Sequence, residues 1–292
     1  MRTLVTGSSG TIGKWVVRRL LEAGHTPRTL DVFAQPRGSD WEHIPGDIRD
    51  LALMRRAVQG MEAVIHLAAI PYDTPNQAEM VLTVNLQGTW NVLLACVEAG
   101  IPRLVNFSSI NALGQAEPSH HELYLPLDDD TPHHPAQPYY LSKHVGEEMC
   151  TAFSTLHPLT VVSLRPSFVS SPGPQGNNWW NFLPEERRIS FSVRDFFSYV
   201  DVRDVAEAAL LGLTAPVQGH EAFLLTADDT WVKNTSAEMV EKYYAHLPWP
   251  KVNREEYLAR SPYISLVDCS YAKRVLGWQP KYSQRDPGAG YE

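Results

Sequence analysis

Three glycines near the N-terminus constrain the fold of this chain more than any other feature. Leu4 and Val5 form a short apolar run, Gly7, Gly10 and Gly13 follow it, and an amphipathic segment comes next. Gly7 permits a tight turn, Gly10 lets the backbone approach a pyrophosphate, and Gly13 allows a helix to pack closely on a strand. A strand, a glycine turn and a helix in this order predict a dinucleotide site in an α/β domain.

Strand and helix patterns alternate beyond this turn. Apolar runs predict strands around residues 28–31, 63–67, 104–107 and 160–164. Helical periodicity is found over 12–21, over 84–98, after Tyr139 and over 204–211. Because the strands are apolar almost throughout, helices should cover both faces of their sheet. The expected fold class is α/β, a Rossmann-type doubly wound parallel sheet with a small C-terminal α/β substrate-binding lobe.

The expected domain division follows a change in composition. Residues 1–165 should form the NAD-binding domain, completed by about 199–215. Residues 165–199 contain several prolines and the pair Trp179 and Trp180, which predicts irregular chain there. Residues 166–198 and 216–292 are therefore assigned to the substrate-binding lobe.

Charge and cysteine content exclude several classes of function. The net charge is −8 and the chain has no basic run, which disfavours a nucleic-acid partner. The three cysteines are far apart and form no Cys-x-x-Cys motif, so neither a zinc site nor a disulfide framework is expected. The histidine pairs at 120–121 and 133–134 lack a ligand spacing, so no metal is expected. No membrane-spanning run or cleavable signal is recognised, which favours a cytoplasmic protein.

Tyr139 and Lys143 carry the chemistry that the sequence suggests. A spacing of four places both side chains on one face of a helix. A lysine cation beside a phenol favours the phenolate and lowers its pKa, so Tyr139 would accept a proton near neutrality. Tyr140 lacks this spacing to Lys143. With a dinucleotide nearby, the pair indicates hydride transfer at a carbon that bears a hydroxyl.

Two acidic residues suggest how the dinucleotide is held. Asp31 lies at the end of the second predicted strand, where a carboxylate binds both ribose hydroxyls and repels a 2′-phosphate. This favours NAD over NADP, although Arg28 and Arg37 lie nearby, and a simple strand-end turn is the alternative. Asp47 would reach the adenine amino group, and Ile48 would cover the adenine ring.

With these motifs in order, the chain resembles the extended short-chain dehydrogenase/reductase family, in its NAD-dependent epimerase/dehydratase group. The shared segments are the glycine turn, 66–69, 85–89, 108–109, 139–143, 165–166 and 199–206. The resemblance implies an enzyme with NAD as cofactor. It also implies a homodimer formed through the helices at 84–98 and 139–157.

The resemblance implies roles for individual residues. Tyr139 would be the acid/base, Lys143 would bind the nicotinamide ribose, and Ser109 would contact the substrate oxygen. Asn85 would support Lys143 through water, or would be an ordinary polar helix residue. The implied cofactor-binding residues are Gly7, Ser9, Gly10, Thr11, Ile12, Gly13, Asp31, Asp47, Ile48, Leu67, Ala68, Ala69, Asn85, Ser108, Tyr139, Lys143 and Pro166. The implied substrate-binding residues are Ser109, Asn111, Tyr139, Ser167, Phe168 and Asn177.

The implied reaction is hydride transfer at a sugar carbinol carbon, as in a nucleotide-sugar 4-epimerase. The short segment 173–199 and the sequence Ser108-Ser109-Ile110-Asn111 also suit a dehydrogenase of free hexuronates or aldoses. A third hypothesis, from a different functional class, is an NAD-binding redox sensor without turnover. The intact Tyr139 and Lys143 count against that hypothesis.

Overall fold

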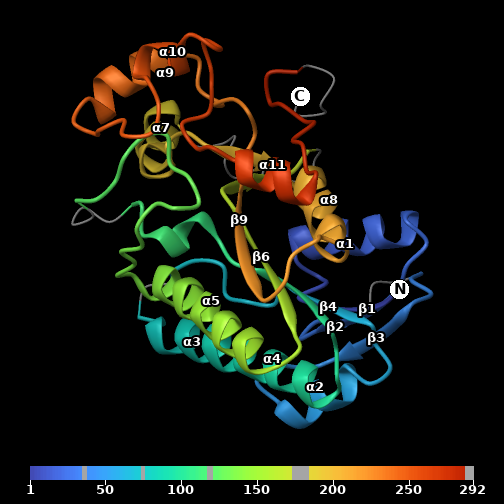
Figure 1. Cartoon of the computed structure of the whole chain (residues 1–292). Helices are drawn as coiled ribbons and strands as arrows, with labels where there is room; N and C mark the ends of the chain where they lie inside the picture. The colour runs from blue at the N-terminus through green and yellow to red at the C-terminus, as the bar shows by residue number, and fades with distance from the viewer. Residues whose placement is uncertain (35–37, 74–75, 117–120, 173–183, 287–292) are drawn as a thin grey trace.

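A seven-stranded parallel sheet forms the centre of the molecule (Figure 1). The computed structural model of the chain describes residues 1–34, 38–73, 76–116, 121–172 and 184–286. The strands are β1 (Arg2–Thr6), β2 (Thr26–Asp31), β3 (Glu42–Pro45), β4 (Ala63–His66), β5 (Arg103–Phe107), β6 (Thr160–Pro166) and β9 (His220–Leu225). Their order is β3-β2-β1-β4-β5-β6-β9. The α/β fold class is therefore confirmed. The short, partly exposed β3 was not expected, because it lacks an apolar run.

Helices cover both faces of this sheet. The helices α1 (Thr11–Glu22) and α8 (Val202–Gly212) share one apolar core. The opposite core contains residues of α2 (Leu51–Ala57), α4 (Gly88–Glu98) and α5 (Pro138–Leu156). Adjacent residues of β1 point to opposite faces of the sheet. Leu4 packs in the core with α2 and α4, whereas Val5 packs in the core with α1. This alternation across the pleat explains why the strands are apolar throughout.

The helix expected at 84–98 begins earlier in the structure. It runs from α3 (Ala78–Leu82) through a π-helical segment (Thr83–Gln87) into α4. Together, Ala78–Glu98 are long and apolar enough to cross a membrane, contrary to the expectation that no such run exists. Half of its most apolar stretch is buried, and Val92, Leu93 and Cys96 lie in the core beneath the sheet. The segment is therefore a core helix of this fold.

The region expected to be irregular contains regular elements. β7 (Phe168–Ser170) pairs in parallel with β8 (Tyr199–Asp201), and α7 (Glu185–Ser192) lies between them in sequence. A 3-10 turn, Val193–Asp195, follows α7. These elements were missed because their short runs are interrupted by prolines and charges.

The C-terminal part adds short helices beyond the sheet. They are α9 (Ser236–Met239), a π-helical segment (Val240–Tyr244), α10 (Arg254–Leu258) and α11 (Ser270–Leu276). Figure 1 shows α7, α9 and α10 gathered on one side of the molecule. β9, which falls within the range 216–292 assigned to the lobe, pairs with β6 in the sheet, and the division into domains stays a prediction. The substrate-binding role of the lobe is a proposal.

Candidate active site

The glycine turn after β1 has two positions that admit no side chain. Gly7 has a φ of +72°, and a Cβ there would lie 2.6 Å from the nitrogen of Ala68. A Cβ on Gly13 would lie 2.2 Å from the carbonyl oxygen of Gly7. The turn and the packing of α1 on β1 therefore both depend on glycine.

Gly10 differs, because the protein itself leaves room for a side chain. Its φ is −68°, and the nearest atom to an added Cβ is the Gly7 oxygen at 3.4 Å, an ordinary contact. Gly10 is the N-cap of α1, and no side chain caps that end of the helix. The hydroxyl oxygen of Ser9 is buried and has no hydrogen-bond partner among the described residues. Open space, uncapped amides and an unpaired hydroxyl together fit a pyrophosphate.

Asp31 fastens the glycine turn to the end of β2. Its Oδ2 accepts a hydrogen bond from the Ser9 amide at 2.8 Å, and its Oδ1 accepts one from the Phe33 amide at 3.1 Å. Each carboxylate oxygen can accept a further bond, so both ribose hydroxyls can still be held. The position of Asp31 beside the turn therefore fits the role expected from the sequence.

The two residues predicted to contact the adenine also contact the protein. Asp47 forms an ion pair with Arg49 at 2.6 Å, and the Arg49 guanidinium lowers the pKa of that carboxyl. Ile48 is buried, and a Cβ on Gly88 would lie 2.2 Å from its Cδ1. Asp47 thus has a strong internal partner, and Ile48 packs against α4.

The loop after β4 approaches the glycine turn through Thr6. The Leu67 amide donates to the Thr6 carbonyl, and the Ala68 amide donates to the Thr6 hydroxyl at 3.3 Å. His66 lies between the hydroxyls of Thr6 and Thr89, and burial lowers its pKa to about 3. His66 is therefore neutral and structural at physiological pH.

Asn85 holds this loop against α5. Its Oδ1 accepts from the Ile70 amide at 2.8 Å, and its Nδ2 donates to the Ile70 carbonyl and to the hydroxyl of Ser142. Asn85 therefore contacts the neighbour of Lys143. Its position in a π-helical segment is typical of functional sites.

Tyr139, Lys143 and Ser109 lie together where α5 begins. The Tyr139 amide donates to Asp73 Oδ1 at 2.7 Å, which satisfies one orphan amide of the helix. Lys143 Nζ lies 5.8 Å from the centre of the Tyr139 ring and donates to the Phe107 carbonyl at 2.7 Å. Ser109 lies near the Tyr139 phenol and favours its ionised form. The three residues predicted to act together thus share one site.

The protonation of this cluster differs from the sequence-based expectation. Burial raises the pKa of Tyr139 to about 12, Ser109 opposes that rise, and the carboxylates of Asp73 and Asp195 add to it. Burial also lowers the pKa of Lys143 to about 8, with Glu147 opposing. Lys143 was expected to share the lowering of the Tyr139 pKa with the oxidised nicotinamide, and without that ring the pKa is raised. Sequence spacing shows the lysine but not the burial of the phenol.

A cavity of about 290 Å³ opens beside Tyr139. Its polar lining includes residues that the sequence did not single out: Asp73, Gln137, Asp195 and Trp231. Gln115 joins two parts of the site, because its Nε2 donates to Asn111 Oδ1 at 2.7 Å and to Asp195 Oδ1 at 3.0 Å. The turn that presents Asp195 continues into Phe196 and Phe197, both at a φ of +55°. Such backbone strain in residues other than glycine is found most often at functional sites.

Of the remaining predicted residues, some line this cavity and others lie outside it. Asn111 and Phe168 line the cavity, whereas Ser167 hydrogen-bonds Thr226 away from it. Ser108 lies beside the Glu147 carboxylate, and Pro166 ends β6. Asn177, Trp179 and Trp180 lie outside the described residues.

A pH-dependent stability difference should arise at Asp195. Burial raises its pKa from 3.8 to about 6, so the folded protein binds this proton more tightly than the unfolded chain. The stability from this group is full below pH 3.8 and is lost as the pH rises through about 6. Asn does not titrate and keeps the oxygen that accepts from Gln115. We therefore expect Asp195→Asn to gain about 1–3 kcal/mol relative to the parent between pH 4 and pH 8.

Urea unfolding of both proteins at the two pH values measures this difference directly. Every other titrating group is shared by the two proteins and cancels. A stability difference that does not change with pH would mean that Asp195 ionises freely in the folded state.

Residues 3–225 match the model of the NAD dependent epimerase/dehydratase family. The chain belongs to this family. The match covers the glycine turn, Tyr139, Lys143 and the sheet through β9. The expectations of an extended short-chain dehydrogenase/reductase, of an enzyme and of NAD as its cofactor are confirmed.

Individual relatives are distant. UDP-glucose 4-epimerase of Mycolicibacterium smegmatis is 28% identical over 311 residues, which cover 96% of this chain and 94% of that protein. Uronate dehydrogenase of Pseudomonas syringae pv. tomato is 26% identical over 263 residues, which cover 89% of this chain and 85% of that protein. The structure of Thermotoga maritima UDP-glucose 4-epimerase with UDP-glucose has a TM-score of 0.72 at 22% identity, covering 100% of this chain and 96% of that one. It shows the shared fold.

Proposed function

We propose that this family member transfers hydride between NAD and a sugar carbinol carbon, in the manner of a nucleotide-sugar 4-epimerase. The observation that carries the proposal is the meeting of Ser109, Tyr139 and Lys143 beside the cavity that Tyr139 lines. Its carboxylates and amides, from Asp73, Asp195 and Asn111, suit a ligand rich in hydroxyl groups. The M. smegmatis epimerase supports the same substrate class.

In this proposal the Tyr139 phenolate accepts the proton of the substrate hydroxyl and becomes the neutral phenol. Ser109 orients that hydroxyl, because it lies beside the phenol and favours its ionised form. Lys143 uses one of its three donors on the Phe107 carbonyl, which leaves two for the nicotinamide ribose. Bound NAD supplies the hydride acceptor and a positive ring. That charge opposes the burial that raises the pKa of Tyr139 to about 12.

The epimerase reaction is tested by the fate of the cofactor. UDP-glucose mixed with the protein and NAD at less than one equivalent per substrate should give UDP-galactose on chromatography, without accumulation of NADH. Stoichiometric NADH with no epimer would contradict an epimerase and identify a dehydrogenase.

A dehydrogenase of free hexuronates is the second candidate. The cavity of about 290 Å³ lies at the small end of ligand sites, which span roughly 300–1,000 Å³. Arg194 lines it and offers a cation for a carboxylate. The P. syringae relative supports this substrate class. Sustained NADH formation with galacturonate or glucuronate would establish it. If neither substrate class reacts although NAD binds, the NAD-binding redox sensor is favoured.

We also propose a homodimer through α4 and α5 and a cytoplasmic location. Trp90, Leu141 and Leu156 of these helices are exposed, with Leu156 75% accessible. An apolar strip of this kind on neighbouring helices suits pairing with a second copy. Light scattering of the purified protein measures the assembly.

A further inference from the structure

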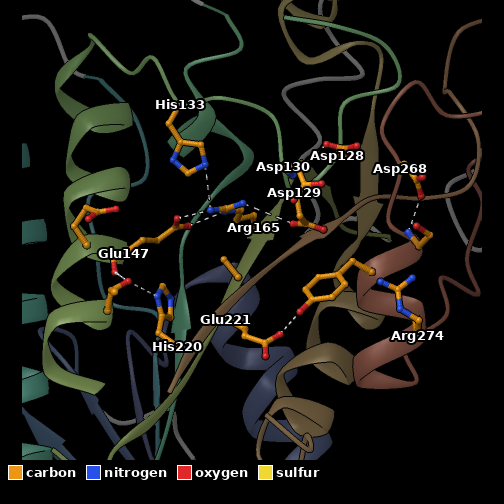
Figure 2. Close-up of a pocket in the computed structure, with 15 residues that line it drawn as sticks. Asp128, Asp129, Asp130, His133, Glu147, Arg165, His220, Glu221, Asp268 and Arg274 are labelled. Atoms are coloured by element: carbon orange, nitrogen blue, oxygen red, sulfur yellow. Dashed lines mark hydrogen bonds and ion pairs between the residues drawn. The ribbon is translucent and has the colours of Figure 1, made fainter. Parts of the chain in front are cut away.

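A second and larger cavity lies between α5, β9 and α11 (Figure 2). It has a volume of about 560 Å³ and shares no lining residue with the cavity at Tyr139. Seven carboxylates and two guanidinium groups line it, together with two histidines. The carboxylates belong to Asp128, Asp129, Asp130, Glu147, Glu148, Glu221 and Asp268. The proposed hydride transfer uses none of these groups.

The two guanidinium groups are too few to neutralise the charge of the seven carboxylates. Arg165 is committed to Glu147 at 2.7 Å, and Arg274 lies over the ring of Tyr271. Burial lowers the pKa of His220 to about 4, so this histidine is neutral. None of the described cations forms an ion pair with Glu221 or Asp268. Figure 2 shows these two carboxylates and Asp129 on different sides of the cavity.

Asp129 has an oxygen that the protein leaves unsatisfied. Its Oδ1 accepts from the Leu224 amide at 2.8 Å and lies 3.7 Å from Arg165 Nη1. Its Oδ2 is buried and has no hydrogen-bond partner in the described part of the chain. An unpaired buried carboxylate oxygen is costly. Burial also raises the pKa of Asp129 to about 7, which a bound cation would reverse.

The rim of the cavity already contains one ammonium group that pairs with its carboxylates. The ammonium group of Lys251 lies between two neighbouring carboxylates, 2.6 Å from Asp128 and 2.9 Å from Asp130. Asp129, between them in sequence, has no such ammonium group. Among the described residues, no three histidine, cysteine or acidic side chains are arranged to hold a metal ion. The chemistry therefore favours an organic ammonium ligand over a divalent cation.

We propose that this cavity binds a small organic diammonium cation. One ammonium group donates to Asp129 Oδ2, and the other lies toward Glu221 and Asp268. The carboxylates on separate sides favour two separated positive charges over one. Such a ligand satisfies the buried oxygen and offsets the excess negative charge.

Isothermal titration of the full chain with putrescine dihydrochloride tests this proposal. We expect saturable binding of one putrescine per chain, with butylamine binding more weakly. Asp129→Asn should weaken putrescine binding by about tenfold or more. Glu255→Gln removes the same charge from an exposed site on α10 and should change binding by less than about twofold. Glu221→Gln provides a second test if Asp129→Asn does not fold.

Several results would overturn the proposal. They are absence of saturable binding, equal losses in Asp129→Asn and Glu255→Gln, or loss of binding at an ionic strength that only screens surface charge. Tyr139→Phe should keep putrescine binding. The failure of the proposed hydride transfer and the failure of this cation site are therefore distinguishable.

Discussion

Tyr139→Phe is expected to reduce hydride transfer by about 10²–10⁴-fold, the usual contribution of a positioned acid/base. The substitution removes only the phenol oxygen. The ring is 8% exposed, so its packing should persist, and Lys143 keeps its bond to the Phe107 carbonyl. NAD affinity should therefore change little, because the lost oxygen belongs to the chemical step.

Absorbance of NADH and titration of NAD binding measure the two effects separately. Tyr140→Phe is the matched control, since Tyr140 is the next residue and its ring lies 6.2 Å from that of Tyr139. It should lose less than about tenfold, as expected for a residue outside the proton transfer. Similar losses in both variants would refute the assignment of Tyr139 as acid/base.

Gly10→Ala should weaken NAD binding while the protein without cofactor remains as stable as the parent. The nearest atom to the new Cβ is the Gly7 oxygen at 3.4 Å, so the fold accepts the methyl group. A pyrophosphate on the first turn of α1 would meet it. We expect Kd for NAD to rise by about tenfold to a hundredfold.

Gly13→Ala is the informative comparison. Its Cβ would lie 2.2 Å from the Gly7 oxygen, so this variant should lose stability before cofactor is added. Thermal unfolding and NAD titration of both variants separate the two roles. Normal NAD affinity in Gly10→Ala would show that the phosphates bind elsewhere.

The parts of the fold with local signals were predictable. The turn after β1, the helix α1 and the apolar strands follow from spacing and periodicity within a few residues of chain. β3 and β7 were missed because four and three residues carry too little periodicity. Their strand conformation comes from pairing with β2 and β8, which is a tertiary effect.

Only those site residues that lie close together in the sequence were predictable. Tyr139 and Lys143 are one helical turn apart, so spacing alone places them together. Asp73 and Asp195 reach the same site from distant segments, and no local signal marks either one. The raised pKa of Tyr139 was missed for the same reason, since burial depends on the packing of the whole site.

The most direct measurement is the absorbance of NADH after the parent protein, with NAD bound, is mixed with nucleotide sugars and free hexuronates. With Tyr139 as acid/base, we expect at least one of these sugars to give sustained NADH if the protein is a dehydrogenase, or its epimer on chromatography without accumulated NADH if it is an epimerase. We also expect that Tyr139→Phe abolishes this turnover while NAD stays bound. Turnover that persists in Tyr139→Phe, or neither NADH nor an epimer from any of these sugars, would contradict this assignment.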